Sequence, residues 1–194
     1  MKRLLLALLA ATPLLLIAEP AAAQSDPAGS LFIGYSYLRV NLEDADEGDA
    51  HGAEVDYTFY MVRRVGFTLS ASAHWGNLDA FDNDFNVPDF EARQLTFLAG
   101  PQFVLWRGLT TEGGLRGMIG VTNRRLDTQI GSIRVSDEWK FTAAGSFNFD
   151  VRLSDRVWWR VLQPSVLFYK FGEDLQADYR IATGLVLRGG EILQ

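Results

Sequence analysis

The sequence predicts an all-β protein, an eight-stranded antiparallel up-and-down barrel that crosses a membrane and is preceded by a cleaved signal peptide. Three observations predict it: an export leader, eight segments in which apolar residues alternate with small or polar ones, and turn-rich connections between them. About ten alternating residues are typical of a transmembrane barrel strand. A water-soluble sheet would bury the apolar row, whereas a membrane barrel turns that row to lipid and its polar row to the lumen.

The leader occupies residues 1–23. Lys2 and Arg3 precede a Leu-rich run, and the small residues 21–23 form a cleavage site before Gln24. Two prolines and one acidic residue interrupt the apolar run, and a transmembrane helix needs about 18 uninterrupted apolar residues. We therefore expect a signal peptide that is removed, rather than a membrane anchor.

Residues 24–194 are expected to form one outer-membrane barrel domain, because their length suits a single domain. The 194-residue chain has no Cys, which excludes a disulfide framework and a lipid-modified Cys. The chain has 18 basic and 24 acidic residues, and the leader removes two basic and one acidic, which leaves a net charge of −7. An acidic chain of this kind argues against nucleic acid as a partner.

The first three segments alternate most clearly. In residues 31–40 the apolar row is Leu31, Ile33, Tyr35 and Tyr37. In residues 53–61 it is Ala53, Val55, Tyr57, Phe59 and Met61. In residues 65–76 it is Val65, Phe67, Leu69, Ala71, Ala73 and Trp75. Small and polar residues occupy the positions between them, as the period of two in a strand requires.

The fourth and fifth segments are less uniform. In residues 94–105 the apolar row is Leu95, Phe97, Ala99, Phe103 and Leu105, with Pro101 in the same row. In residues 113–122 it is Leu115, Ile119 and Val121. Because proline lacks the N–H that a central ladder needs, we expect a bulge or a locally broken pair at Pro101.

The last three segments complete the barrel. In residues 141–152 the apolar row is Phe141, Ala143, Phe147, Phe149 and Val151. Residues 157–171 are less regular and contain Pro164, a second candidate for a bulge. In residues 178–188 the row is Tyr179, Ile181, Leu185 and Leu187.

The connections alternate in length along the chain. The long ones are residues 41–50, 77–90, 123–137 and 172–175, and the short ones are 62–64, 107–110 and 153–156. Outer-membrane barrels have long loops outside and short turns on the periplasmic side. The first two long loops are acidic, and the short turns carry Arg63, Arg64, Arg107 and Arg156. The even number of strands lets both ends of the domain lie on one side of the closed barrel.

All five tryptophans fall near the ends of predicted strands: Trp75, Trp106, Trp139, Trp158 and Trp159. We expect them to form the aromatic girdles found at the two membrane interfaces. A soluble core would more often bury tryptophan in mid-strand.

Residues 147–188 read FNFDVRLSDRVWWRVLQPSVLFYKFGEDLQADYRIATGLVLR. This stretch resembles the porin-like, opacity-type and OmpA-like family of small outer-membrane barrels, whose later strands carry a similar D-V-R-L-S turn, an Arg early in the seventh strand and a Thr-Gly pair in the last. Residues 99–103 resemble the Gly-Pro segment of the family's fourth strand. The resemblance implies an eight-stranded barrel and no particular activity, because the family is functionally mixed.

The chain departs from this family after Arg188. Family members usually finish the last strand with a terminal aromatic that the assembly machinery recognises, and residues 189–194 contain none. Either these residues extend past the barrel, or assembly uses a weaker signal.

The polar rows predict a lumen with charges of both signs: Glu54, Asp56, Arg116, Asp150, Arg152, Arg160, Asp178 and Arg180. An eight-stranded barrel is just wide enough for its own side chains, and unpaired buried charges are costly. We therefore expect a structural network of ion pairs that plugs the lumen. Asp150 and Arg160 are the favoured pair, since a short turn makes their strands neighbours.

Catalytic, cofactor and metal sites are not expected. Ser72 and His74 share a strand face near Glu54 and Asp56, which invites comparison with barrel lipid hydrolases. Residues i and i+2 on a strand are about 7 Å apart, however, too far for a nucleophile–base hydrogen bond. The carboxylates of residues 41–49 could hold a divalent cation, but they lack EF-hand spacing and fit a solvated acidic loop.

These features favour a non-enzymatic protein of a Gram-negative outer membrane, with a structural or adhesive role. Its expected partners are outer-membrane lipid and lipopolysaccharide, the barrel assembly machinery, and a surface partner reached through residues 41–50 and 77–90. Two alternatives remain open at this point. One is a minor channel for small solutes, and the other is a soluble periplasmic barrel that binds an apolar ligand.

Overall fold

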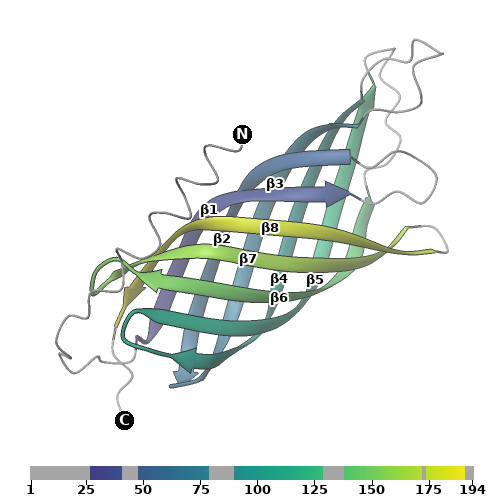
Figure 1. Ribbon diagram of the computed structural model, residues 1–194. Coiled ribbons are helices and arrows are strands. Elements are labelled where there is room, and N and C mark those ends of the chain that lie inside the picture. Colours follow the sequence, from purple (N-terminus) through teal and green to yellow (C-terminus); the bar gives the residue numbers. More distant parts are fainter. Residues whose placement is uncertain (1–26, 41–47, 79–89, 129–137, 172–173, 191–194) are drawn as a thin grey trace, which may run out of the picture.

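Eight strands form one closed antiparallel barrel (Figure 1). The computed structural model describes residues 27–40, 48–78, 90–128, 138–171 and 174–190. The strands are β1 (Gly29–Val40), β2 (Gly48–Val62), β3 (Val65–Leu78), β4 (Phe90–Arg107), β5 (Thr111–Thr128), β6 (Glu138–Arg152), β7 (Val157–Phe171) and β8 (Asp174–Gly189). Each strand pairs with its neighbours in the chain, and β8 pairs with β1 to close the barrel. The predicted fold class is confirmed.

Several strands extend beyond their predicted bounds toward the long loops. β2 begins at Gly48 rather than at residue 53, and β5 continues to Thr128 rather than ending at 122. The added register pairs include Glu91 with Asp127 and Arg93 with Arg125. Arg124 is buried and Arg125 is exposed, so polar residues lie on both faces at this point and backbone pairing continues where the apolar alternation has ended.

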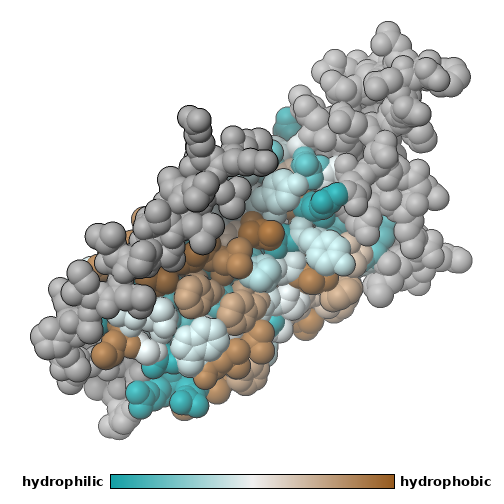
Figure 2. Space-filling view, in the orientation of Figure 1, coloured by the Kyte–Doolittle hydropathy of each residue, from teal (hydrophilic) through white to brown (hydrophobic). Residues whose placement is uncertain are grey.

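The two faces of the wall are inverted relative to a soluble protein. Outward apolar side chains are exposed, as Ile119 and Phe141 illustrate at 59% and 66%, and Figure 2 shows brown side chains spread over the outer face of the strands. Inward polar side chains such as Thr68 and Glu54 are fully buried. The soluble-barrel alternative, which needs the apolar rows inside, is therefore wrong. The wall is that of a transmembrane barrel.

The strands are strongly tilted, as Figure 1 shows. The pairing partners of Gly66 lead around all eight strands and return to β3 at Gly76, ten residues further along. With usual strand spacings this stagger corresponds to a tilt of about 40°. The apolar row from Val65 to Trp75 then covers about 25 Å along the barrel axis, the height of a typical lipid-facing band.

Two bulges lie within the ladders, and a further register shift, between Tyr60 and Val62, lies beside the turn that joins β2 to β3. On β4 the register with β5 shifts between Val104 and Trp106, whereas Pro101 keeps its register with Phe67 on β3. On the β5 side, however, the ladder passes from Ala99 to Gln102 with no partner for Pro101, so the locally broken pair expected there is confirmed. The bulge itself lies further along β4, where Trp106 covers Gly113 and leaves no room for a side chain there.

The second bulge is in β7, between Arg160 and Gln163, just before Pro164. Thr183 of β8 lies beside it. Its hydroxyl donates to the carbonyl oxygen of Arg160 at 2.9 Å and accepts from Trp159 Nε1 at 3.2 Å. The hydroxyl of Thr183 thus provides a hydrogen-bond partner for one backbone carbonyl and for one tryptophan side chain at the point where the register of the ladder shifts.

Three short turns join β2 to β3, β4 to β5 and β6 to β7, at the barrel end where β1 starts and β8 finishes. Among the described residues, none forms a helix long and apolar enough to cross a membrane. The leader 1–23 lies outside the described residues, as do most of the loops 41–50, 77–90, 123–137 and 172–175 and residues 191–194 of the tail.

Candidate functional site

The lumen is the candidate site, because the inward rows of all eight strands meet there. Short inward side chains on β3 and β6, such as Ser72 and Ser146, leave room for long ones from the other strands. Arginines from β5, β7 and β8 occupy that room: Arg116, Arg160 and Arg180, each at most 4% exposed. The alternation of strand faces thus places cations inside a barrel whose outside is apolar.

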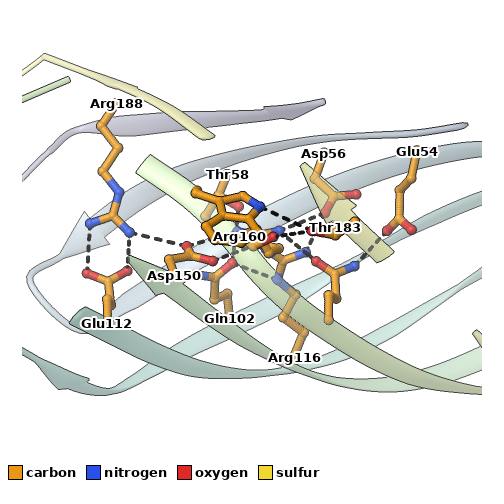
Figure 3. Close-up of polar contacts among 12 residues, drawn as sticks. Glu54, Asp56, Thr58, Gln102, Glu112, Arg116, Asp150, Arg160, Thr183 and Arg188 are labelled. Atoms are coloured by element: carbon orange, nitrogen blue, oxygen red, sulfur yellow. Dashed lines mark hydrogen bonds and ion pairs between the residues drawn. The ribbon is translucent and has the colours of Figure 1, made fainter. Parts of the chain in front are cut away.

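Asp56 is the centre of the lumen network (Figure 3). Its Oδ2 accepts from Arg116 Nη1 at 2.5 Å and from Arg160 Nη1 at 3.3 Å. Arg160 also donates two hydrogen bonds to Asp150, at 2.8 and 3.2 Å. Two guanidinium groups and two carboxylates from β2, β5, β6 and β7 therefore neutralise one another across the lumen.

Gln163 connects this cluster to the next ion pair. Its amide oxygen accepts from Arg160 at 2.6 Å, and its amide nitrogen donates to Glu54 at 2.7 Å. Glu54 lies 3.2 Å from Arg180, which also donates to Ser72 at 3.1 Å. A neutral side chain thus joins two charged clusters. The β7 bulge gives Gln163 this inward position, because it reverses the alternation after Arg160.

A further cluster lies at the short-turn end of the lumen. Glu112 accepts from Arg188 at 2.9 and 3.0 Å and also from Arg107. Arg188 additionally donates to Asp150 at 3.3 Å, and its guanidinium lies 3.8 Å from the ring centroid of Trp158. The charged network therefore continues from mid-barrel to this end.

At the loop end, Arg124 is the cation. It donates to Asp178 at 2.7 Å, to Gln94 at 2.7 and 2.9 Å, and to the hydroxyl of Tyr169. Tyr169 donates in turn to Asp178. A cluster of buried residues also lies in the lumen, and its members are Leu38, Ala50, Leu98, Met118, Ala144, Leu167 and Tyr169. Charged and apolar side chains are therefore both buried in the described part of the lumen.

Seven of the eight predicted lumen residues are buried inside: Glu54, Asp56, Arg116, Asp150, Arg160, Asp178 and Arg180. Arg152 is not among them. It is the last residue of β6, and it bonds to Asp155 of the following turn and to the carbonyl of Leu109. Residue 152 is an inward position by strand alternation, but the Arg152 side chain contacts the neighbouring turns instead of the lumen.

Sequence reasoning missed three charged residues that are buried in the described part of the lumen: Glu112, Arg124 and Arg188. Arg124 lies in a predicted loop because the apolar alternation ends before it, and Glu112 lies just outside the predicted fifth strand. Arg188 lies in the polar row of the last predicted strand, so the alternation of that strand could have identified it as a lumen residue.

Ser72 and His74 lie inside the lumen but bond to different partners. His74 Nε2 is 2.9 Å from Ser36 Oγ, whereas Ser72 Oγ accepts from Arg180. A nucleophile–base pair needs a hydrogen bond between the two groups. Each side chain instead contributes to the packing of the lumen.

No protein-family model matches the sequence, and no curated protein matches it. Solved structures match closely in shape. Neisserial surface protein A superposes with a TM-score of 0.66 at 5% identity, over 83% of this chain and 97% of that one. Ail, the attachment invasion locus protein of Yersinia pestis, gives 0.56 at 14% identity, over 84% and 99%. OprG, an outer-membrane protein of Pseudomonas aeruginosa, gives 0.50 at 14%, over 86% and 99%.

The fold is that of a small outer-membrane β-barrel. An outer-membrane barrel carries aromatic girdles at its two interfaces, and four of the five tryptophans face outward: Trp75, Trp106, Trp139 and Trp159. Trp158 is the exception, because it is only 1% exposed and packs inside the lumen under Arg188. Adjacent residues of a strand point to opposite faces, so Trp158 and Trp159 cannot both join the girdle.

Proposed function

We propose that the protein is a non-enzymatic barrel of the Gram-negative outer membrane with a structural or surface-contact role, its lumen closed by its own side chains. The observation that carries this proposal is the sharing of Asp56 by Arg116 and Arg160. These three residues come from β2, β5 and β7 and join opposite parts of the wall. An eight-stranded interior is just wide enough to be filled in this way.

The location follows from the outward apolar band and from the predicted leader 1–23, which would direct export. The barrel would then contact outer-membrane lipid and lipopolysaccharide and would be inserted by the barrel assembly machinery. Two similar structures are named for a surface protein and for an attachment and invasion locus. Those names favour a contact at the cell surface, which we assign to residues 41–50 and 77–90.

A minor channel is the second candidate, and one observation favours it. Within the described part of the lumen, Glu54 Oε2 and Arg116 Nη2 have no hydrogen-bond partner in the protein. Polar atoms of this kind attract water, and connected water could pass small solutes.

Conductance in planar lipid bilayers separates the two candidates. We expect the wild-type protein to give no discrete current steps, and we expect steps only when Arg116→Ala and Arg160→Ala are combined, because this removes the two side chains that reach Asp56. Discrete steps in the wild type, altered by either single substitution, would favour the channel.

Loop replacement tests the surface role. Replacing residues 41–47 and 79–89, the parts of these two loops that lie outside the strands, by short turns should preserve the difference in gel mobility between unheated and boiled samples, because all eight strands are retained. Attachment of producing cells to a host-cell or matrix surface should fall. Unchanged attachment to every surface that the wild type binds would contradict the surface role.

A further inference from the structure

A groove crosses the outer face of four neighbouring strands, β5 to β8, which lie side by side in the wall (Figure 1). Its volume is about 620 Å³, within the range of roughly 300–1,000 Å³ that small-molecule sites occupy. Strands about 4.8 Å apart make a groove across four of them about 14 Å long. Outward side chains form its two sides: Leu115, Phe147, Pro164 and Ile181 toward the short turns, and Val166 and Tyr179 toward the long loops.

The floor of the groove lacks side chains. Gly117 of β5 and Gly145 of β6 are register partners, and both face outward. Packing within the barrel does not require glycine at either position, because a Cβ would meet nothing within 4 Å. At Gly120, by contrast, a Cβ would lie 1.9 Å from the carbonyl oxygen of Phe97. Glycine inside a strand weakens the strand and often marks a place where another molecule closely approaches the backbone.

The groove is continuous with the surface that contacts lipid. Leu115 and Ile181 on its sides are 46% and 48% exposed and belong to the outward apolar rows. Because the strands are tilted, the groove rises only about 9 Å along the barrel axis and stays within the apolar band, which is about 25 Å tall. Apart from the hydroxyl of Tyr179, the outward side chains that line it are apolar. The molecule that fills the groove therefore comes from the hydrocarbon region of the membrane.

We propose that the groove binds an acyl chain of a phospholipid from the periplasmic leaflet, with the chain lying over Gly117 and Gly145. Trp106 assigns the leaflet. It is exposed beside a short turn, at the level where an interfacial tryptophan contacts head groups, and its ring lies 5.9 Å from that of Phe147 in the groove. The short turns mark the periplasmic side, whose leaflet contains phospholipid. The assignment rests on the outer-membrane location proposed above and names the lipid that this face recognises.

A second copy of the barrel is the competing occupant, since small residues let membrane segments approach closely. The shape of the groove favours the acyl chain. Large exposed side chains such as Leu115 and Tyr179 flank the glycine floor, and the outer wall of a barrel is convex. A neighbouring barrel would therefore meet these side chains before it reached the floor. An acyl chain is one carbon wide, fits between them, and gains dispersion contacts on both sides.

Native mass spectrometry of the folded, detergent-solubilised protein tests the proposal, because the mass reports bound lipid and oligomeric state together. Phosphatidylethanolamine with palmitoyl and oleoyl chains is the probe. Gly117→Leu combined with Gly145→Leu fills the groove and should weaken binding of the probe at least about tenfold, or about 1.4 kcal/mol. Leu115→Ala combined with Ile181→Ala removes part of one side and should also weaken it. In protein purified from outer membranes, the retained lipid should have the mass of a phospholipid.

A second pair of small residues supplies the control. Ala53 of β2 and Ala73 of β3 are register partners on the outward face and do not line the groove. Ala53→Leu combined with Ala73→Leu adds similar apolar bulk elsewhere on the wall and should keep binding within about twofold of the wild type. Gel mobility of unheated samples shows whether each variant is folded.

Unchanged binding in the filled variant, or an equal loss in the control, would overturn the assignment. Retention of lipopolysaccharide in place of phospholipid would overturn the choice of leaflet. A wild-type dimer that the filled variant abolishes would identify a second copy as the occupant and would also overturn the assignment. These outcomes are separate from failure of the proposed function, which is read from the cell fraction, conductance and attachment.

Discussion

Arg116 of β5 donates to Asp56 of β2 across the lumen at 2.5 Å, although sixty residues separate them in the sequence. Both side chains are 1% exposed. Breaking a buried ion pair by removing one partner is far more costly than breaking a surface pair, because it leaves a charge uncompensated in a medium of low dielectric constant. The stability of the barrel should therefore depend on its lumen as well as on its ladders.

Asp56→Asn should lower the free energy of unfolding by about 3–5 kcal/mol, because Arg116 and Arg160 would then face each other without their shared carboxylate. Chemical unfolding in detergent, followed by tryptophan fluorescence, measures the change. Asp155→Asn is the matched control: Asp155 pairs with Arg152 in an exposed turn, and an exposed pair contributes about 0–1 kcal/mol. Equal effects of the two substitutions would contradict a lumen held by ion pairs.

Gly184→Ala should prevent closure of the barrel. A Cβ at this position would lie 2.3 Å from the Cα of Gly34, its register partner on β1, so the strands β1 and β8 would have to separate. Unheated samples should then lose the mobility of the folded form in gels. Gly145→Ala is the control, since a Cβ there meets nothing within 4 Å, and it should fold normally.

The two faces of the wall can be distinguished with variants that retain one tryptophan. Brominated lipids quench tryptophans that contact acyl chains or the interface. Trp75 is 53% exposed on the outer face and should be quenched strongly, whereas Trp158 is 1% exposed inside the lumen and should be protected. Strong quenching of Trp158 and protection of Trp75 would mean that the faces are reversed.

The sequence alone predicts the barrel well, because a period-two apolar pattern directly reports which face meets lipid. It fails where the wall extends past the membrane, as at Arg124, since strands there continue with polar residues on both faces. It also fails at Trp158, although residues 158 and 160 share a strand face and Arg160 was predicted to point inward; the contact of Trp158 with Arg188 depends on tertiary structure. The network partners across the lumen, such as Asp56 and Arg116, follow from the barrel's closure and stagger, which no local pattern contains.

The Thr-Gly pair shows how a short sequence motif acquires a physical meaning from the structure. Thr183 bonds to the carbonyl of Arg160 beside the β7 bulge, and Gly184 allows the close approach of Gly34 where β8 meets β1. Thr183 therefore supports the pairing of β8 with β7, and Gly184 allows the pairing of β8 with β1 that closes the barrel.

The most direct test of the central claim, a closed transmembrane barrel with its apolar face in the lipid, is gel mobility of the outer-membrane fraction, unheated against boiled. We expect the protein in that fraction, with an unheated band that migrates differently from the boiled one, because a closed barrel stays folded in detergent until it is heated. Recovery in the soluble periplasmic fraction, with identical mobility before and after boiling, would contradict the account.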